Sequence, residues 1–184
     1  MLMRARWLLA TLLAAVALGY VLTACDSDSG QDSPATVAAT PQVTPASPAA
    51  DAPPSTTASA GGRTVEMGIG TYCWTQSCVD KIGPITKGRL DVNRRDRVRV
   101  AVPAGTPPLR EVNVTAFPAG VSQDLGNGET AWQPDYDKSI ELIPVRIGQG
   151  IEFAADLPPG SYVVSVGMFF EPGDVQYGVV LEVK

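Results

Sequence analysis

The sequence predicts an all-β fold, a β-sandwich of about 7–9 short strands, preceded by a linker and a signal peptide. Between residues 63 and 184, apolar residues recur at every second position, as in strands with one buried face. Gly and Pro separate these runs, and no stretch keeps the apolar spacing of a helix. A segment of about 120 residues is large enough for one core. We therefore expect one β-sandwich domain over 63–184.

Four runs show the clearest alternation. Their apolar positions are Val98, Val100 and Val102; Val112, Val114 and Ala116; Tyr162, Val164, Val166, Met168 and Phe170; Val175, Tyr177, Val179, Leu181 and Val183. The last two runs are joined by residues 171–174, where Pro172 and Gly173 favour a tight turn. Residues 140–147 and 151–155 are predicted to form a further hairpin around the glycines at 148 and 150.

A corner motif precedes the third of these runs. Residues 157–162, Leu-Pro-Pro-Gly-Ser-Tyr, resemble the Leu-x-Pro-Gly-x-Tyr corner of immunoglobulin-like and fibronectin-III-like sandwiches. The resemblance implies an immunoglobulin-like or fibronectin-III-like β-sandwich. It also implies a structural corner made by Leu157, Gly160 and Tyr162, in which the tyrosine hydroxyl bonds back to the corner backbone. A plain loop before a strand is the alternative. Either interpretation concerns the fold alone.

The N-terminus has the features of an export signal. Arg4 and Arg6 precede an apolar run, residues 7–22, that is shorter than the roughly 20 residues of a membrane-spanning helix. Residues 22–25, Leu-Thr-Ala-Cys, resemble the lipobox of bacterial lipoproteins. The resemblance implies a signal peptide over 1–24 and a fatty-acylated Cys25 that anchors the protein to the cell membrane on its extracytoplasmic side. An uncleaved anchor or an ordinary secretory signal is the alternative.

A polar segment follows the lipobox. Residues 25–62 are rich in Ser, Thr, Ala and Pro and contain few branched apolar residues. Repeated prolines disfavour helix and sheet, and so little apolar surface cannot offset the entropy of the chain. We predict a disordered tether over 25–62 that ends at Gly61-Gly62. A recognition segment for a proline-binding partner is the alternative.

Cys73 and Cys78 are the cysteines that remain once Cys25 is lipidated. An oxidising compartment favours a disulfide between them, which would pin a turn between two short strands. Tyr72 and Trp74 would share the strand face opposite Cys73, either as an aromatic ligand platform or as core. A redox pair is disfavoured by the spacing, and a metal site by the absence of histidine and further thiols.

The wider string over residues 70–84, Gly-Thr-Tyr-Cys-Trp followed by Cys-Val-Asp and Gly-Pro, resembles a motif of uncharacterised bacterial lipoproteins. The resemblance covers roughly 15 residues. It implies a β-rich domain of the cell envelope and brings no activity with it.

The charge balance disfavours nucleic acid as a partner, since 14 Lys and Arg stand against 19 Asp and Glu. A local basic cluster nevertheless comprises Lys87, Arg89, Arg94, Arg95, Arg97 and Arg99. Arg97 and Arg99 should point away from the valine face of their strand. They indicate either a solvated edge strand protected from pairing or a patch for an anionic polymer, lipid headgroups or an acidic partner.

No catalytic set emerges from the sequence. The chain has no histidine, so the Ser-His-Asp and Cys-His mechanisms are excluded. Carboxylates at 124, 129, 135 and 137 surround Trp132, and they leave open a carboxylate-only hydrolase or a Ca²⁺ site as alternatives. We expect no cofactor and no metal.

The predicted function is a membrane-anchored, non-enzymatic binding module for an envelope protein or an anionic polymer. Its candidate ligand-binding residues are Tyr72, Trp74, Trp132, Arg97 and Arg99. A structural or protease-inhibitory envelope protein is the alternative, and the carboxylate-only hydrolase is a further one.

Overall fold

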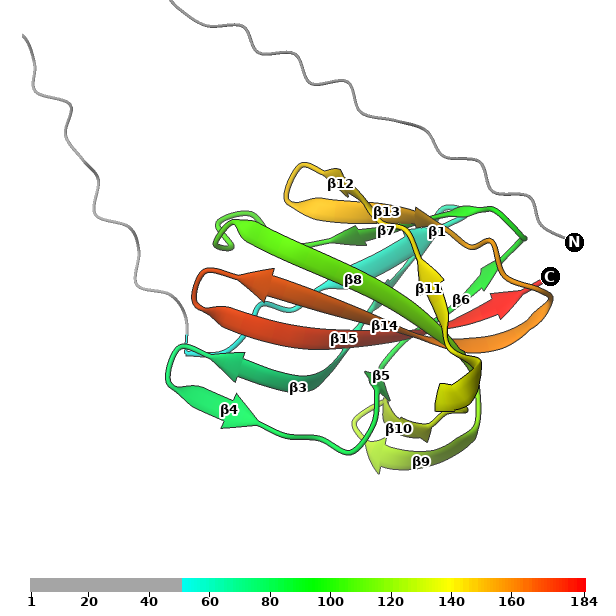
Figure 1. The fold of residues 1–184 in the computed structure, drawn as a ribbon, viewed down its shortest axis with the longest axis horizontal. Coiled ribbons are helices and arrows are strands. Elements are labelled where there is room, and N and C mark those ends of the chain that lie inside the picture. The colour runs from blue at the N-terminus through cyan, green and yellow to red at the C-terminus, as the bar shows by residue number, and fades with distance from the viewer. Residues whose placement is uncertain (1–50) are drawn as a thin grey trace, which may run out of the picture. The chain divides into compact units, whose positions relative to one another are not determined.

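The computed structural model describes residues 51–184 as one β-rich unit (Figure 1). The predictions for the signal peptide, for Cys25 and for most of the tether lie outside the described residues. Over residues 51–184 no helix is long and apolar enough to cross a bilayer.

The described part of the chain contains fifteen strands and one short 3₁₀-helix. Their bounds are β1 (Thr57–Ala60), β2 (Arg63–Glu66), β3 (Gly68–Trp74), β4 (Ser77–Val79), β5 (Ile85–Thr86), β6 (Arg89–Val92), β7 (Arg97–Ala101), β8 (Leu109–Pro118), β9 (Val121–Gly126), β10 (Glu129–Gln133), η1 (Tyr136–Lys138), β11 (Ile140–Leu142), β12 (Val145–Ile147), β13 (Gly150–Ala154), β14 (Gly160–Phe170) and β15 (Gly173–Val183). The prediction of an all-β protein is confirmed.

Two sheets form a sandwich around the main core. One sheet has five strands in the order β12-β13-β7-β1-β2, and the other has seven, with β11-β8-β14-β15-β3-β4 in line and β6 paired to β15 (Figure 1). The inner face of the first sheet contributes Val98, Val100 and Phe153 to the core. The facing sheet contributes the alternate residues of β14 and β15, among them Val166 and Tyr177. The predicted β-sandwich is confirmed, while the immunoglobulin-like or fibronectin-III-like topology in particular stays a prediction.

The hairpin of β14 and β15 runs through the middle of the seven-stranded sheet. Its antiparallel register extends from the Gly160–Val183 pair to the Phe169–Asp174 pair, and β8 pairs with the other side of β14. Every apolar position predicted for the inner face of these two strands is buried. The predicted tight turn at Pro172 and Gly173 connects them, because the strands end at Phe170 and resume at Gly173.

A third, smaller sheet covers part of the outer face of the seven-stranded sheet. It has the order β5-β10-β9, and its Trp132 packs with Val163 and Val180 in a second apolar cluster. Two glycines of the seven-stranded sheet allow the backbone of β5 to approach closely. A Cβ added at Gly178 would lie 2.2 Å from the backbone oxygen of Ile85, and one added at Gly68 would lie 2.5 Å from it. The sequence predicted too few strands because strands of two to four residues carry almost no periodic signal.

The folded region begins earlier than predicted. Strand β1 lies inside the segment expected to be tether, and it pairs with β2 on one side and with β7 on the other. Its Ala58 and Ala60 are buried in the main core. Small alanines give no hydrophobic pattern, so the sequence did not reveal the strand. Gly61 and Gly62, which were predicted to end the tether, instead form the turn between β1 and β2, with φ of 55° and 79°.

Tyr177 ties the segment before β1 to the sandwich. Its hydroxyl donates a hydrogen bond of 2.7 Å to the backbone oxygen of Pro54. Burial raises the pKa of this hydroxyl to about 12, and the nearby Thr56 hydroxyl has a smaller, lowering effect. The predicted corner forms in part: Leu157 and Tyr162 are buried, and the Tyr162 ring lies over Gly160. No hydrogen bond of the Tyr162 hydroxyl occurs within residues 51–184, so the tyrosine that ties down a backbone segment is Tyr177 instead.

Two further expectations need correction. Strand β7 is the middle strand of its sheet, so the interpretation of Arg97 and Arg99 as part of an edge strand is wrong. The predicted hairpin around Gly148 and Gly150 forms between β12 and β13, but residues 140–142 leave it. They pair as β11 with β8 in the other sheet. Pro144 lies between β11 and β12 and lacks the N–H that a continuous strand would need.

Candidate functional site

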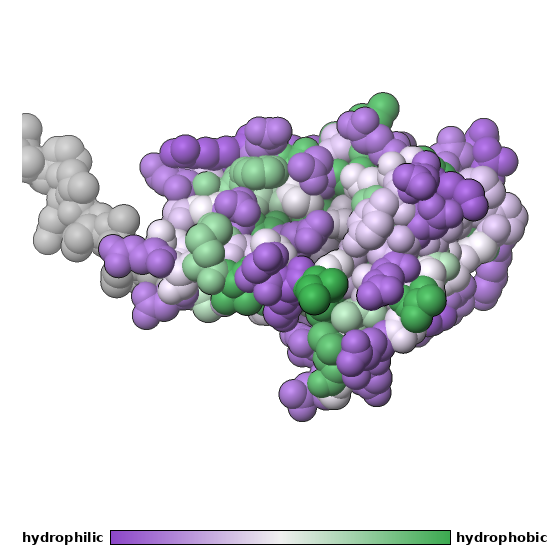
Figure 2. All heavy atoms as spheres, turned by 60° about the horizontal axis from the view of Figure 1, so that its bottom comes forward, coloured by the Kyte–Doolittle hydropathy of each residue, from purple (hydrophilic) through white to green (hydrophobic). Residues whose placement is uncertain are grey.

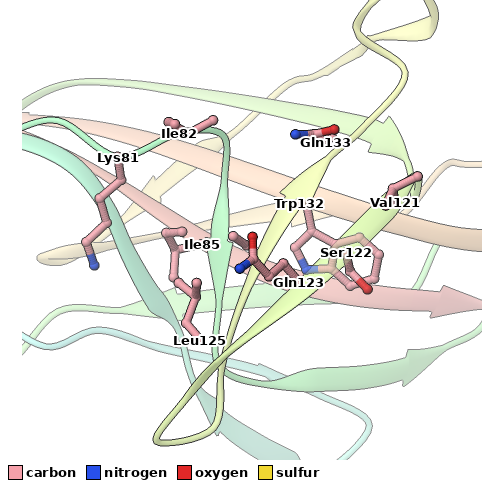
Figure 3. Close-up of a pocket in the computed structure, with 10 residues that line it drawn as sticks. Lys81, Ile82, Ile85, Val121, Ser122, Gln123, Leu125, Trp132 and Gln133 are labelled. Atoms are coloured by element: carbon pink, nitrogen blue, oxygen red, sulfur yellow. The ribbon is translucent and has the colours of Figure 1, made fainter.

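A groove opens between the third sheet and the loop before it. It is a cavity of about 490 Å³ lined by Lys81, Ile82, Ile85, Val121, Ser122, Gln123, Leu125, Ala131, Trp132 and Gln133. Figure 3 shows that these side chains come from the loop that leads into β5, from β5 itself, from β9 and from β10. We call this feature the β9 groove.

The walls of the β9 groove expose apolar side chains to solvent. Ile82 is 85% exposed, Val121 73% and Leu125 46%. Figure 2 turns the lower end of the molecule toward the reader, and apolar residues gather there among polar neighbours. Scattered single apolar residues are normal on a protein surface, whereas several that line one concave site mark a candidate binding surface.

Close backbone contacts hold the loop wall of the groove. Gly83 has φ of +73°, and a Cβ there would lie 2.1 Å from the backbone oxygen of Trp132. Beside it, the Trp132 N–H donates to the Pro84 oxygen at 3.1 Å. Lys81 is anchored as well, because its ammonium donates to the Ile69 oxygen at 2.8 Å and its backbone N–H donates to Thr71 Oγ1 at 3.1 Å. The loop that carries Ile82 is therefore fixed at both ends.

Trp132 forms part of the groove and also holds the third sheet in place. It is 8% exposed, and its indole Nε1 donates a hydrogen bond of 2.8 Å to Thr86 Oγ1. Its ring packs with Val163 and Val180 on the outer face of the sandwich. Of the five predicted ligand-binding residues, Trp132 is the one that lines the groove, and most of its surface serves packing.

Carboxylates flank the groove without lining it. Asp124 lies on β9, where its Oδ1 accepts the Gly126 N–H at 2.8 Å, and Glu129 begins β10. Asp80 accepts a hydrogen bond from Thr71 Oγ1 at 3.2 Å beside Lys81. Lys81 is the one cationic residue in the lining, and its Nζ lies 4.0 Å from Glu129. The surroundings of the groove are therefore acidic on balance.

The predicted cysteine pair forms a disulfide between facing residues of β3 and β4. It closes the turn at Thr75 and Gln76, as expected. The aromatic platform does not form, because Trp74 is buried and meets the Phe170 ring edge-on with centroids 5.5 Å apart. Tyr72 packs against the same core. The alternative interpretation, in which these side chains belong to the core, is correct for Trp74, whereas Tyr72 is partly buried.

The basic cluster is largely neutralised by ion pairs. Arg94 and Arg95 share Asp156, at 3.1 and 3.7 Å, and Arg97 lies 3.8 Å from Glu152 on the neighbouring strand. Two further pairs join Lys87 to Glu66 and Arg89 to Glu182. Arg99 is the one cation of the cluster without an ion pair among residues 51–184. The positive potential expected from six adjacent cations is therefore much reduced.

Three of the four carboxylates considered for hydrolysis serve local structure. Asp124 accepts its turn N–H, Glu129 faces Lys81, and Asp135 pairs with Lys138 at 3.0 Å. None of the four lines the β9 groove. Within the described residues, no group of three or more His, Cys, Asp or Glu residues could hold a metal ion.

Sequence reasoning missed Ile82, Val121 and Leu125. Ile82 is a lone apolar residue beside Gly83 and Pro84, and such loops carry no periodic pattern. Val121, Gln123 and Leu125 alternate, but with only two apolar members the run is too short to separate from chance. These three residues form one apolar surface only in the folded chain, where β9 and the loop before β5 line the same groove.

Comparison with known proteins identified no relative of this chain. The chain matches no protein-family model, no curated protein and no solved structure.

Proposed function

We propose that this protein is a lipid-anchored, extracytoplasmic binding module without enzymatic activity, and that it recognises its partner through the β9 groove. The exposed apolar walls of the groove, formed by Ile82, Val121 and Leu125, are the observation that carries the proposal. A concave apolar site with a few polar groups is the usual form of a recognition surface.

The anchor part of the proposal depends on Cys25 and the lipobox resemblance. A multiply acylated cysteine would hold the protein on the membrane because each buried CH₂ contributes roughly 0.8 kcal/mol. We expect Cys25→Ala to abolish incorporation of labelled palmitate and to release the protein from the membrane fraction. Palmitate labelling that persists in this variant would contradict the anchor.

The chemistry of the groove favours binding over catalysis. Its lining combines apolar side chains with Ser122, Gln123 and Gln133, and Lys81 is the single charged member. The Lys81 ammonium is occupied by the Ile69 oxygen, and Ser122 has no histidine to activate it in this chain. The groove therefore offers contact area and hydrogen bonds.

The competing surface, the basic cluster, is less suited to binding an anionic polymer. Five of its six cations lie within 4.0 Å of a carboxylate, so a polyanion would have to compete with those partners. Within residues 51–184, the β9 groove has no such competing partners for its exposed apolar side chains and is therefore the better recognition surface.

The test uses the full chain in lipid nanodiscs and a displayed library of random ten-residue peptides, with empty nanodiscs for subtraction. The groove variant is Ile82→Ser/Leu125→Ser. Ile143→Ser is a matched control, because Ile143 is 84% exposed but lies outside the groove. We expect peptides selected on the unaltered chain to bind the groove variant roughly tenfold more weakly and the control equally well.

Two outcomes would refute the groove as the recognition surface. One is a selection that yields no peptides above the empty nanodiscs. The other is equal affinity for the unaltered chain and the groove variant. Denaturant unfolding of both variants verifies that the β-sandwich domain remains folded.

A further inference from the structure

We propose that the partner supplies an extended peptide segment that pairs with the free edge of β9 as a fourth strand of the third sheet. The segment is apolar at alternate positions and basic at its flanks. This inference rests on the proposed function of the β9 groove and names the chemistry of its partner.

The edge of β9 is open. The strand is last in the order β5-β10-β9, and β10 is its one pairing partner among the described strands. All six of its residues, from Val121 to Gly126, are exposed. One side of its backbone is thus available for the N–H and C=O groups of another extended chain, and such edges are templates for strand addition.

Proteins commonly protect such an edge with proline, lysine or a covering segment. Strand β9 contains neither proline nor lysine, and no part of residues 51–184 covers it. Its single charged residue, Asp124, turns its carboxylate to the Gly126 N–H at the end of the strand. The edge is therefore left able to pair.

The side chains of β9 suit a peptide with alternating apolar residues. Val121, Gln123 and Leu125 share one face of the strand, and Gln123 lies opposite Ala131 of β10, which also lines the groove. A strand added to the edge places every second side chain beside these three residues. Apolar side chains at those positions would cover Val121 and Leu125 and extend the contact toward the groove.

The negative charge around the groove favours a peptide with basic residues at its flanks. Asp80, Asp124 and Glu129 border the groove, and the one cation in its lining, Lys81, is held by the Ile69 oxygen and lies close to Glu129. A basic flank would complement these carboxylates. A second copy of this chain would bring the same carboxylates together, and an anionic membrane surface would also be repelled.

The test measures binding of a synthetic peptide, Lys-Val-Ser-Val-Ser-Val-Lys, to the full chain in nanodiscs of uncharged lipid. Two matched peptides carry N-methyl groups, one on the valine amides and the other on the serine amides. In an extended strand these two sets of N–H groups point to opposite edges. We expect one methylated peptide to bind roughly tenfold or more weakly and the other to bind like the parent.

A second comparison replaces both lysines of the peptide with glutamate. We expect weaker binding by roughly tenfold at low salt, with the difference shrinking as salt rises. The groove variant Ile82→Ser/Leu125→Ser should also lose affinity for the parent peptide, and Ile143→Ser should retain it.

The outcomes separate this inference from the proposed function. If both methylated peptides bind like the parent while the groove variant loses affinity, strand pairing is wrong and the groove function stands. If the groove variant also binds like the unaltered chain, both fail. A Leu125-dependent dimer of the full chain, detected by analytical ultracentrifugation, would assign the edge to a second copy and overturn the inference.

Discussion

Trp74 and Trp132 are both buried tryptophans, yet they stabilise very different regions. Trp74 belongs to the main core between two sheets, where it meets Phe170 and many other apolar side chains. Trp132 belongs to a small cluster with Val163 and Val180, and it fastens a three-stranded sheet to the outside of the sandwich. One tryptophan supports the fold, whereas the other supports the groove.

The difference shows how one β-rich unit can combine a stable scaffold with a separately anchored small sheet, where we propose that binding occurs. The sandwich buries its strands on long antiparallel ladders, of which β14–β15 is the longest. The third sheet has short strands, an open edge at β9 and one substantial anchor. Elements with few buried contacts open at lower free energy than the core does. The proposed recognition site thus lies where a local conformational change costs little free energy.

The largest expected effect comes from truncating the two tryptophans. We expect Trp74→Ala to lower the free energy of unfolding of the whole β-sandwich domain by about 4 kcal/mol, because a large core side chain is lost. Trp132→Ala should instead increase hydrogen exchange locally in residues 85–86 and 121–133. Denaturant unfolding and hydrogen-exchange mass spectrometry distinguish the two. An equal loss of hydrogen-exchange protection across the whole β-sandwich domain in both variants would contradict the division into two separate regions.

Gly178→Ala tests the contact between the two regions. The new Cβ would meet the backbone oxygen of Ile85, so β5 must shift. We expect this shift to lower the free energy of unfolding by about 2 kcal/mol. Gly167→Ala is the matched control on the adjacent strand, because its Cβ would meet the Asn113 side chain, which can move. We expect only Gly178→Ala to weaken peptide binding at the groove. Equal effects of the two alanines would show that β5 does not depend on this approach.

The stability of the sandwich should depend on pH through Tyr177. Tyrosine in the unfolded chain ionises near pH 10, whereas burial holds the pKa of Tyr177 at about 12. Between these values the unfolded state binds fewer protons than the folded state. Stability from this group is therefore fully present below pH 10 and falls by about 2 kcal/mol as the pH rises to 12.

Tyr177→Phe provides the comparison for that measurement. It removes the hydrogen bond to the Pro54 oxygen and should lower the free energy of unfolding by about 1 kcal/mol at neutral pH. Denaturant midpoints measured from pH 8 to 12 should then decline less steeply in the variant than in the unaltered chain. Parallel declines would show that another group causes the alkaline loss.

The smallest expected effect is that of Arg97→Gln/Arg99→Gln. Both residues are exposed, and exposed pairs such as Arg97–Glu152 contribute little, so we expect stability to change by less than about 0.5 kcal/mol. Peptide binding at the groove should be unchanged. Retention on an anionic polymer, measured across a salt series, tests the basic cluster separately. A clear loss of salt-sensitive retention would give this surface a binding role of its own.

The sequence alone predicted the parts of the structure whose signals are local. Alternating apolar residues identified both long strands of the central hairpin, and Pro172 and Gly173 identified its turn. The positions of Cys73 and Cys78 predicted their disulfide. The lipobox at Cys25 predicts a membrane anchor, which lies outside the described residues and stays a prediction.

Tertiary structure decided what depends on distant residues. Whether Trp74 is platform or core depends on Phe170 and the facing sheet, and whether Arg97 is free depends on Glu152. Ala58 and Ala60 lie in an inner strand of the sheet because β1 pairs with β7, although their own hydrophobic pattern is weak. The groove needs the loop at Ile82 and the edge at Leu125 to meet, some forty residues apart in the chain. Periodicity shows which face of a strand is apolar, but only packing determines whether that face is covered.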